Sequence, residues 1–452
     1  MKKILILGSI AVSIFAQNIE LKSGWNLLGA IEDLNIKNSS CIEKSFNFQN
    51  RAWSSSGDIK QGNGFWAYSS KDCLFDTDSV VEVDRGSLVN SELVTTVDKT
   101  TLASLFKVLG LAIDTEYDVE IYRVSYKTIN TDLELENLTG VISIPKGVDN
   151  VPILSYQHGT IQLIEDAPSS LDDDTQLLAS LFTTTGFVTV MSDYLGYNTE
   201  AGFENKLHPY HLKEPTVSAT LDLLRATKEF LTQKNLTFNE QLFLGGYSEG
   251  GYATMALDGA LSQSSEFTVT ASVPMAGAYD LNYTANYLIE LEENHPTPMY
   301  FPFVVLAYNN MYKFTDTPES FFTENYKVAV DAFNNLENYT EEGLDALLSP
   351  DIKSMFDFSD NAGSYGSFKA QFEAKFEENS VYKYEPEGKV RLYHCKGDRD
   401  VPYQNSLIAY EYLKDRGDVT LVEIENSENL DHGTCGTPSL MSVIPWFASL
   451  KN

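Results

Sequence analysis

The 452-residue sequence predicts an α/β protein: a mostly parallel sheet with a mainly helical insertion, preceded by a small β-rich module. From about residue 84, short apolar runs typical of buried strands alternate with segments of helical periodicity, which is the pattern of a parallel sheet. Residues 282–387 interrupt this alternation with a segment rich in Tyr, Phe, Asn and Glu. Residues 17–80 differ from both parts, because short apolar or alternating runs there are separated by turn residues.

The N-terminus has the features of an export signal. Lys2 and Lys3 precede an apolar run over residues 4–16, and polar residues follow it. The run is too short to span a bilayer but suits a secretory signal, so we expect residues 1–16 to be removed after Ala16. No later segment of the sequence is long and apolar enough to span a membrane. The sequence therefore predicts an exported protein, extracellular or periplasmic, without an integral membrane segment.

The β module, residues 17–80, contains three of the four tryptophans, Trp25, Trp53 and Trp66. Its GWNLLG and GFWAY segments resemble a small N-terminal module found on various exported bacterial proteins, a resemblance that names no activity. The tryptophans have two interpretations. They fill a small core, or they are exposed and contact a surface or a glycan.

Four cysteines in an exported chain fit two disulfides, for which three pairings are possible. Their positions favour Cys41 with Cys73 and Cys395 with Cys435, one pair in each expected domain. The alternative is that the thiols are free and buried.

The larger domain, residues 84–452, is expected to take its sheet and its helices from a series of recognisable segments. Strands are expected within residues 117–129, 138–147, 151–160, 186–197, 241–251, 268–280, 389–398 and 419–425. Helices are expected at residues 214–233, 251–261 and 438–450. The insertion at 282–387 falls between two strands, so it should lie over the carboxyl edge of the sheet and act as a cap.

The segment Gly246-Tyr247-Ser248-Glu249-Gly250 carries the first chemical signal. A strand-like segment precedes it and a helix-like segment follows it, as in the sharp turn that presents a nucleophilic serine above a sheet edge. The five-residue pattern alone is a weak signal, because it also occurs by chance. The strand-like segment before it and the helix-like segment after it make the signal much stronger. We therefore predict that Ser248 is a nucleophile.

A serine hydroxyl needs a base, and the base needs a carboxylate. His432 lies in a polar, Gly-bearing segment after the last expected strand, and Asp398 and Asp400 follow the preceding strand. The order Ser248, Asp, His432 is the one that this arrangement requires. Spacing to Val401-Pro402 favours Asp398, whereas spacing from Gly397 favours Asp400. We prefer Asp398, and expect the other carboxylate to cap the turn or remain solvated.

The negative charge that forms on a substrate oxygen when the serine attacks also needs hydrogen-bond donors. We expect the backbone N–H groups of Glu249 and Thr160 to supply this oxyanion hole, with Gly159 allowing close approach. His158 is expected to shape that loop. His208 and His211 are three residues apart with a proline between them, which is not the spacing of a helix-borne ligand pair. We therefore expect no metal site formed by them with Asp193.

Several segments of the chain together resemble those of a known family. The segments QHGT, SDYLGY, HPYH, GYSEGG and DHGT, with the acid loop before Val401-Pro402, fall in one order along the chain. Residues 85–450 resemble an α/β-hydrolase of the secretory lipase/esterase group, similar to the fungal lipase A type with an inserted cap. The resemblance implies hydrolysis of small-molecule or lipid esters through an acyl-enzyme, without a metal or organic cofactor. Cys395 departs from it, because related chains often carry Gly there.

The net charge of −32 and a pI near 4.4 argue against a nucleic-acid partner, because binding to phosphates requires clustered Lys and Arg. Two other functions stay open beside ester hydrolysis. One is a serine peptidase on the same fold, and the other is a surface-binding protein whose hydrolase domain is inert.

Overall fold

The computed structural model describes the chain from residue 85 onwards, with gaps at 133, 202–205, 292–293, 336–342 and 345. Of the earlier chain it describes residues 18–21, 24–30, 34–35, 42, 44–49, 52–54, 58–59, 64–70, 73–76 and 80–82. The chain divides into two compact units, Met1–Val83 and Asp84–Asn452. The expected export signal at 1–16 and Cys41, half of one expected disulfide, lie outside the described residues.

The first unit is built from antiparallel β-strands, which confirms its predicted β-rich character. Its strands are β1 (Asn18–Leu21), β2 (Gly24–Ala30), β3 (Leu34–Asn35), β4 (Lys44–Gln49), β5 (Ala52–Ser54), β6 (Asp58–Ile59), β7 (Gly64–Ser69), β8 (Cys73–Asp76) and β9 (Val80–Glu82). The largest sheet has the order β5-β4-β7-β2-β9, and β1 pairs with β8 and β3 with β6. In it, Trp25 and Leu27 of β2 stand opposite Tyr68 and Trp66 of β7.

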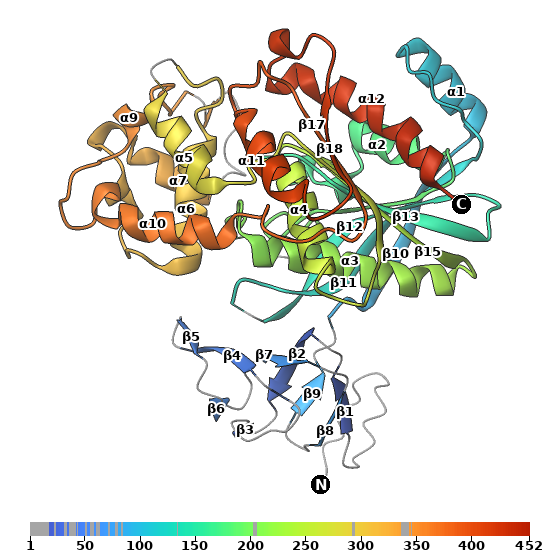
Figure 1. The fold of residues 1–452 in the computed structure, drawn as a ribbon, viewed down its shortest axis with the longest axis horizontal. Coiled ribbons are helices and arrows are strands. Elements are labelled where there is room, and N and C mark those ends of the chain that lie inside the picture. Colours follow the sequence, from blue (N-terminus) through green and yellow to red (C-terminus); the bar gives the residue numbers. More distant parts are fainter. Residues whose placement is uncertain are drawn as a thin grey trace. The chain divides into compact units, whose positions relative to one another are not determined.

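A nine-stranded sheet organises the second unit, which has the predicted α/β class (Figure 1). Its strands are β10 (Leu88–Val97), β11 (Val119–Ile129), β12 (Leu135–Pro145), β13 (Asn150–Gln157), β14 (Val188–Ser192), β15 (Thr237–Tyr247), β16 (Val269–Met275), β17 (Lys389–His394) and β18 (Val419–Glu423). Their order is β10-β11-β12-β14-β13-β15-β16-β17-β18. The pairs from β10 to β14 are antiparallel, and those from β14 to β18 are parallel.

Helices cover both faces of this sheet, so its central strands read as continuous apolar runs. The helices are α1 (Lys99–Val108), α2 (Asp173–Thr183), α3 (Lys213–Gln233), α4 (Glu249–Leu261), α11 (Gln404–Leu413) and α12 (His432–Leu450), with short turns η1 (Ile164–Asp166), η2 (Pro168–Ser170) and η6 (Ser427–Asn429). Helices α1, α2 and α12 share one apolar core, in which Phe182 and Phe447 pack. Helices α3 and α4 share the other, around Leu223 and Leu257. Burying each such side chain stabilises the fold by about 1.5–3 kcal/mol relative to leaving it exposed.

The insertion between β16 and β17 is mainly helical, as its composition suggested. It contains α5 (Leu281–Glu290), α6 (Tyr300–Tyr312), η3 (Pro318–Phe321), η4 (Glu324–Tyr326), α7 (Val328–Asn334), α9 (Ile352–Met355) and α10 (Tyr365–Asn379), drawn in yellow and orange in Figure 1. Its core is aromatic: Phe301 packs edge-on against Phe356, and Tyr365 stacks on Phe372. The Tyr308 hydroxyl donates to the carbonyl of His211, which ties the insertion to the sheet domain.

Several local features differ from expectation. Strand β10 and the helices α1, α2 and α11 were not predicted, and β10 is an edge strand whose Val89, Leu93 and Val94 remain exposed. The final helix begins at His432 rather than 438, because the Asp431 side chain accepts a hydrogen bond from the N–H of Thr434 and caps it. No helix in the described part of the chain is long and apolar enough to cross a membrane.

The two units should fold independently, because every described apolar core cluster of the sheet domain draws its residues from beyond position 84. We expect a fragment of residues 84–452 to unfold cooperatively in circular dichroism and to keep the hydrolase activity that the sequence predicts for the chain beginning at residue 17. An insoluble fragment, or one that folds without activity, would contradict this division.

Candidate active site

Ser248 stands at the turn between β15 and α4 in a backbone conformation that few residues adopt, with φ +61° and ψ −122°. The turn is held in place because the N–H of Ser248 donates to the carbonyl of Met275 at 2.9 Å. Glycines allow it to form. A Cβ added at Gly250 would lie 2.0 Å from the carbonyl oxygen of Gln157, and one at Gly246 would lie 2.6 Å from the same atom. Any larger residue would push the loop after β13 away from the serine.

A hydrogen-bond chain connects the three residues that the sequence singled out. Nε2 of His432 lies 2.7 Å from Oγ of Ser248, and Nδ1 of His432 lies 2.5 Å from Oδ2 of Asp398. The carboxylate can only accept, so Nδ1 carries the proton and Nε2 accepts from the serine hydroxyl. All three residues are buried, with at most 8% of their surface exposed.

The Asp398 carboxylate accepts four hydrogen bonds. Oδ1 receives the backbone N–H groups of Asp400 and Val401, at 3.0 and 2.9 Å. Oδ2 receives His432 and, at 3.2 Å, Nε2 of His394. Burial opposes the charge, but the hydrogen bonds from His394 and His432 outweigh it and lower the pKa of Asp398 to about 2. Burial also disfavours a charged His432, yet its hydrogen bond to Asp398 raises the pKa of His432 above its ordinary value.

Asp400, the alternative acid, makes no such contact. Within the described residues its carboxylate accepts no hydrogen bond, and the Oδ1 atom is buried without a partner. It therefore does not cap the turn, and only about a tenth of its side chain is exposed. The structure places Asp398, and not Asp400, against His432.

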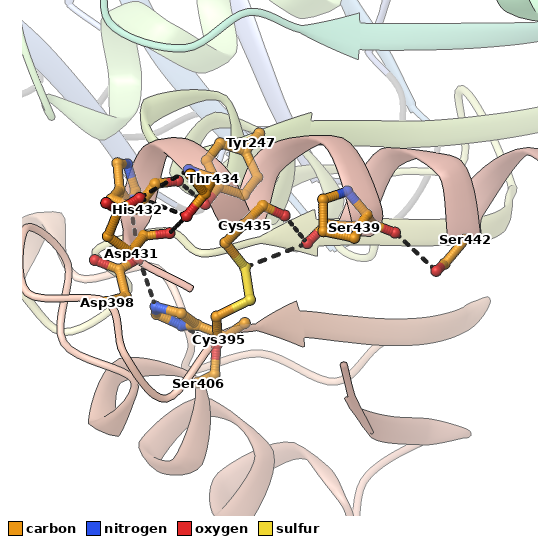
Figure 2. The surroundings of a disulfide bond; sticks show 12 residues. Tyr247, Cys395, Asp398, Ser406, Asp431, His432, Thr434, Cys435, Ser439 and Ser442 are labelled. Atoms are coloured by element: carbon orange, nitrogen blue, oxygen red, sulfur yellow. Dashed lines mark hydrogen bonds and ion pairs between the residues drawn. A yellow bond between two sulfur atoms is a disulfide. The ribbon is translucent and has the colours of Figure 1, made fainter. Parts of the chain in front are cut away.

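A disulfide joins the acid loop to the base helix. Cys395 follows β17 and Cys435 lies in the first turn of α12, and their sulfurs are bonded as the sequence predicted, with the Cα atoms 5.9 Å apart. Figure 2 shows Asp398 and His432 facing each other beside this bond. The Tyr247 hydroxyl, next to the nucleophile, donates to the carbonyl of His432 at 2.5 Å. The loop, the helix and the nucleophile turn are thus linked to one another.

The two expected oxyanion donors come from different segments, Thr160 from the loop after β13 and Glu249 from the residue directly after Ser248. A Cβ added at Gly159 would lie 3.8 Å from Cβ of Ser248, so the residue directly before Thr160 lies close to the nucleophile. The N–H of Glu249 belongs to the first residue of α4. Within the described residues, neither amide donates to a protein acceptor, so both are available to a substrate oxygen. The Nδ1–H of His158 donates to the Gly159 carbonyl at 2.7 Å, which suits the expected structural role of that histidine.

A cavity adjoins Ser248. Most of its wall is apolar and comes from the insertion. The insertion residues are Leu281, Thr284, Ala285, Leu288, Tyr300, Phe301, Val304 and Phe376. Asp400 is the acidic residue in this wall. Among the described residues, no group of three or more His, Cys, Asp or Glu is placed to hold a metal.

Comparison with known proteins decides the family. The sequence profile of the secretory lipase family matches residues 169–448, more than half of the chain. The chain belongs to the secretory lipase family. It is therefore a hydrolase of the lipase and esterase type that acts on ester substrates, and membership of this family implies export. No protein of curated function matches the chain significantly.

Solved structures resemble this secretory lipase over most of its length. A candidate hydrolase from Legionella pneumophila is 25% identical, with a TM-score of 0.71, covering 80% of this chain and 98% of its own. The rice cell wall degrading esterase LipA from Xanthomonas oryzae is 23% identical, with a TM-score of 0.68 and coverage of 81% and 98%. Candida antarctica lipase A is 16% identical, with a TM-score of 0.56 and coverage of 77% and 78%. The last two likenesses support the α/β-hydrolase fold.

One buried pair of the lipase site was not predicted from the sequence. Oε1 of Glu249 lies 2.7 Å from Nε2 of His208, whose Nδ1–H donates to the carbonyl of Leu195 at 2.7 Å. Burial raises the pKa of Glu249, but nearby His208, His211 and His158 outweigh it and lower that pKa, so Glu249 is the carboxylate acceptor of this pair. It holds the side chain of the residue whose N–H is an expected oxyanion donor. The feature of the sequence that could have indicated this pair is the glutamate inside the nucleophile motif.

The disulfide should stabilise this lipase and keep its acid and base aligned. Replacing Cys395 and Cys435 together by Ala should lower the free energy of unfolding by about 2–4 kcal/mol, since the bond closes a loop over a sequence separation of 40. Turnover should fall as well, because the acid loop and the base helix lose their link. Guanidinium unfolding and ester kinetics measure the two effects. Ser442→Ala, on the exposed side of α12, is the control, and a loss of stability no larger than in this control would contradict the prediction.

Proposed function

We propose that the chain is a secreted serine ester hydrolase, a lipase or carboxylesterase, with Ser248 as nucleophile, His432 as general base and Asp398 as the acid that orients His432. The observation that carries the proposal is the hydrogen-bond chain from Ser248 through His432 to Asp398. It begins at a strained strand-to-helix turn and adjoins an apolar cavity.

In the proposed mechanism, Oγ of Ser248 attacks the ester carbonyl carbon while Nε2 of His432 takes the hydroxyl proton. The carbonyl oxygen becomes an oxyanion and accepts hydrogen bonds from the N–H groups of Glu249 and Thr160. His432 then gives its proton to the departing alcohol oxygen, which leaves an acyl-enzyme on Ser248. Water, deprotonated by His432, attacks the acyl carbon and releases the acid. These steps use protein groups and water, without a metal or organic cofactor.

Asp398 stays ionised throughout this cycle, because its four hydrogen bonds favour the carboxylate form. Its charge stabilises the imidazolium that exists while His432 holds the serine proton. The apolar wall of the cavity suits the acyl or alcohol part of an ester.

The proposal extends to where the protein acts. Residues 1–16 would direct export to the periplasm or the extracellular space, where a disulfide such as Cys395–Cys435 persists. The β module at residues 17–80 would then be free to contact a surface or a glycan, a proposal that rests on the sequence of that module alone.

A fluorophosphonate probe tests the nucleophile directly. We expect it to label the peptide containing Ser248 in the native protein and to leave Ser248→Ala unlabelled. Ser248→Ala and His432→Ala should each lower kcat for p-nitrophenyl esters by at least about 10⁴-fold, and Asp398→Ala by about a thousandfold or more, because such groups act as a unit. Folded variants that keep a few per cent of wild-type turnover would refute the assignment. Faster hydrolysis of aminoacyl anilides than of esters would indicate a peptidase.

The rate should also depend on pH through His432. The base must be neutral, and its pKa is raised, so the acid limb of kcat/KM should have its midpoint above pH 6.5. For the same reason, protonated His432 stabilises the fold fully below about pH 6.5, and this contribution declines as the pH rises through the raised pKa. Asp398→Asn should move the acid limb to lower pH. An acid limb at or below pH 6.5 in the wild type would contradict the prediction.

A further inference from the structure

Asp400 presents a contrast with Asp398, two residues earlier in the same loop. The Asp398 carboxylate accepts four hydrogen bonds, whereas that of Asp400 accepts none from the described residues. The side chain of Asp400 is nevertheless about nine-tenths buried. Burying a carboxylate without a partner destabilises a fold, so the position of Asp400 requires a reason other than stability.

Among the described residues, the groups nearest to Asp400 do not supply the missing partner. Nδ1 of His295 lies 3.8 Å from Oδ1 of Asp400, which is too far for a hydrogen bond. That nitrogen also accepts the backbone N–H of Thr297 at 3.1 Å, so it carries no proton to share. The Arg399 guanidinium donates to the carbonyl of Asn294.

Asp400 lines the same cavity as Ser248, and its neighbours there are mostly apolar, among them Leu281, Leu288 and Phe301. We propose that Asp400 is a specificity-determining residue, which accepts a hydrogen bond from a hydroxyl group of the substrate. The preferred substrates are then esters that carry a hydroxyl in the part entering the cavity. This inference rests on the proposed ester hydrolysis and names its substrate class.

A hydroxyl fits this site better than an ammonium group does. The cavity wall is largely apolar, so a cation that entered it would lose its hydration and gain a single carboxylate as its partner. Such desolvation is costly. A neutral hydroxyl is cheaper to desolvate and still forms a charge-assisted hydrogen bond with Asp400.

The loop geometry also suits a role in positioning the substrate. The N–H of Asp400 donates to Oδ1 of Asp398, and Oδ2 of the same carboxylate accepts from His432. The same loop therefore holds a hydroxyl bound by Asp400 and aligns the base with Ser248. The ester carbonyl can be held at the nucleophile while its hydroxyl is recognised.

The test uses the full-length protein, matched ester pairs and two variants of Asp400. One pair is p-nitrophenyl 3-hydroxybutyrate and p-nitrophenyl butyrate, with the hydroxyl in the acyl part. Another is 2-hydroxyethyl butyrate and propyl butyrate, with the hydroxyl in the alcohol part. Butyrylcholine and 3,3-dimethylbutyl butyrate form a third pair, which differs in charge alone. Asp415→Asn, at an exposed position, controls for the loss of one negative charge.

In the wild type we expect kcat/KM to favour the hydroxyl-bearing member of at least one of the first two pairs. Asp400→Leu should lower that preference about tenfold or more, and Asp400→Asn less, because an amide oxygen still accepts. Asp400→Leu should also raise Tm, because it removes an unpartnered carboxylate. Asp415→Asn should change neither.

Three results would overturn the inference: an unchanged hydroxyl preference in Asp400→Leu, no such preference in the wild type, or a loss confined to the choline pair. Each of these leaves ester hydrolysis standing, because the apolar esters are still cleaved. Failure of the wild type to cleave any of the six esters, together with no fluorophosphonate labelling, would instead refute the proposed function.

Discussion

The carboxylate of Asp398 holds together the part of the molecule on which the proposed chemistry depends. Its four hydrogen bonds come from the turn after β17, from the end of that strand and from the first residue of α12. The disulfide between Cys395 and Cys435 links the same two segments covalently. A buried charge is stable only when its hydrogen-bond partners are fixed. The contacts of Asp398 and the geometry of its loop therefore depend on each other.

The nucleophile and base could be identified from sequence because their signals are local. Ser248 lies in a five-residue motif between a strand and a helix, and its glycines are required because a side chain there would meet the carbonyl of Gln157. His432 and the Asp398–Asp400 loop follow in the expected order. The pairing of Cys395 with Cys435 was predicted, and the structure confirms it.

What the sequence could not provide depends on tertiary packing. Spacing alone did not separate Asp398 from Asp400, because the choice depends on which side chain the turn directs toward His432. The contact of His208 with Glu249 joins residues 41 positions apart, and no local pattern announces it. Strand β10 was missed because it is an exposed edge strand, where burial leaves little periodic signal. The early start of α12 depends on a single capping carboxylate, Asp431.

The position of His432 on the last helix has a consequence for the order of folding. Ser248 and His432 are 184 residues apart in the chain, and their contact forms only when α12 packs against the sheet through residues such as Phe447. Contacts between such distant segments pay a large loop-closure cost, and synthesis delivers the C-terminal helix after every strand of the sheet. A nascent or partly translocated chain that already contains the nucleophile turn therefore lacks its base. The hydrolytic site is completed only at the final step of assembly.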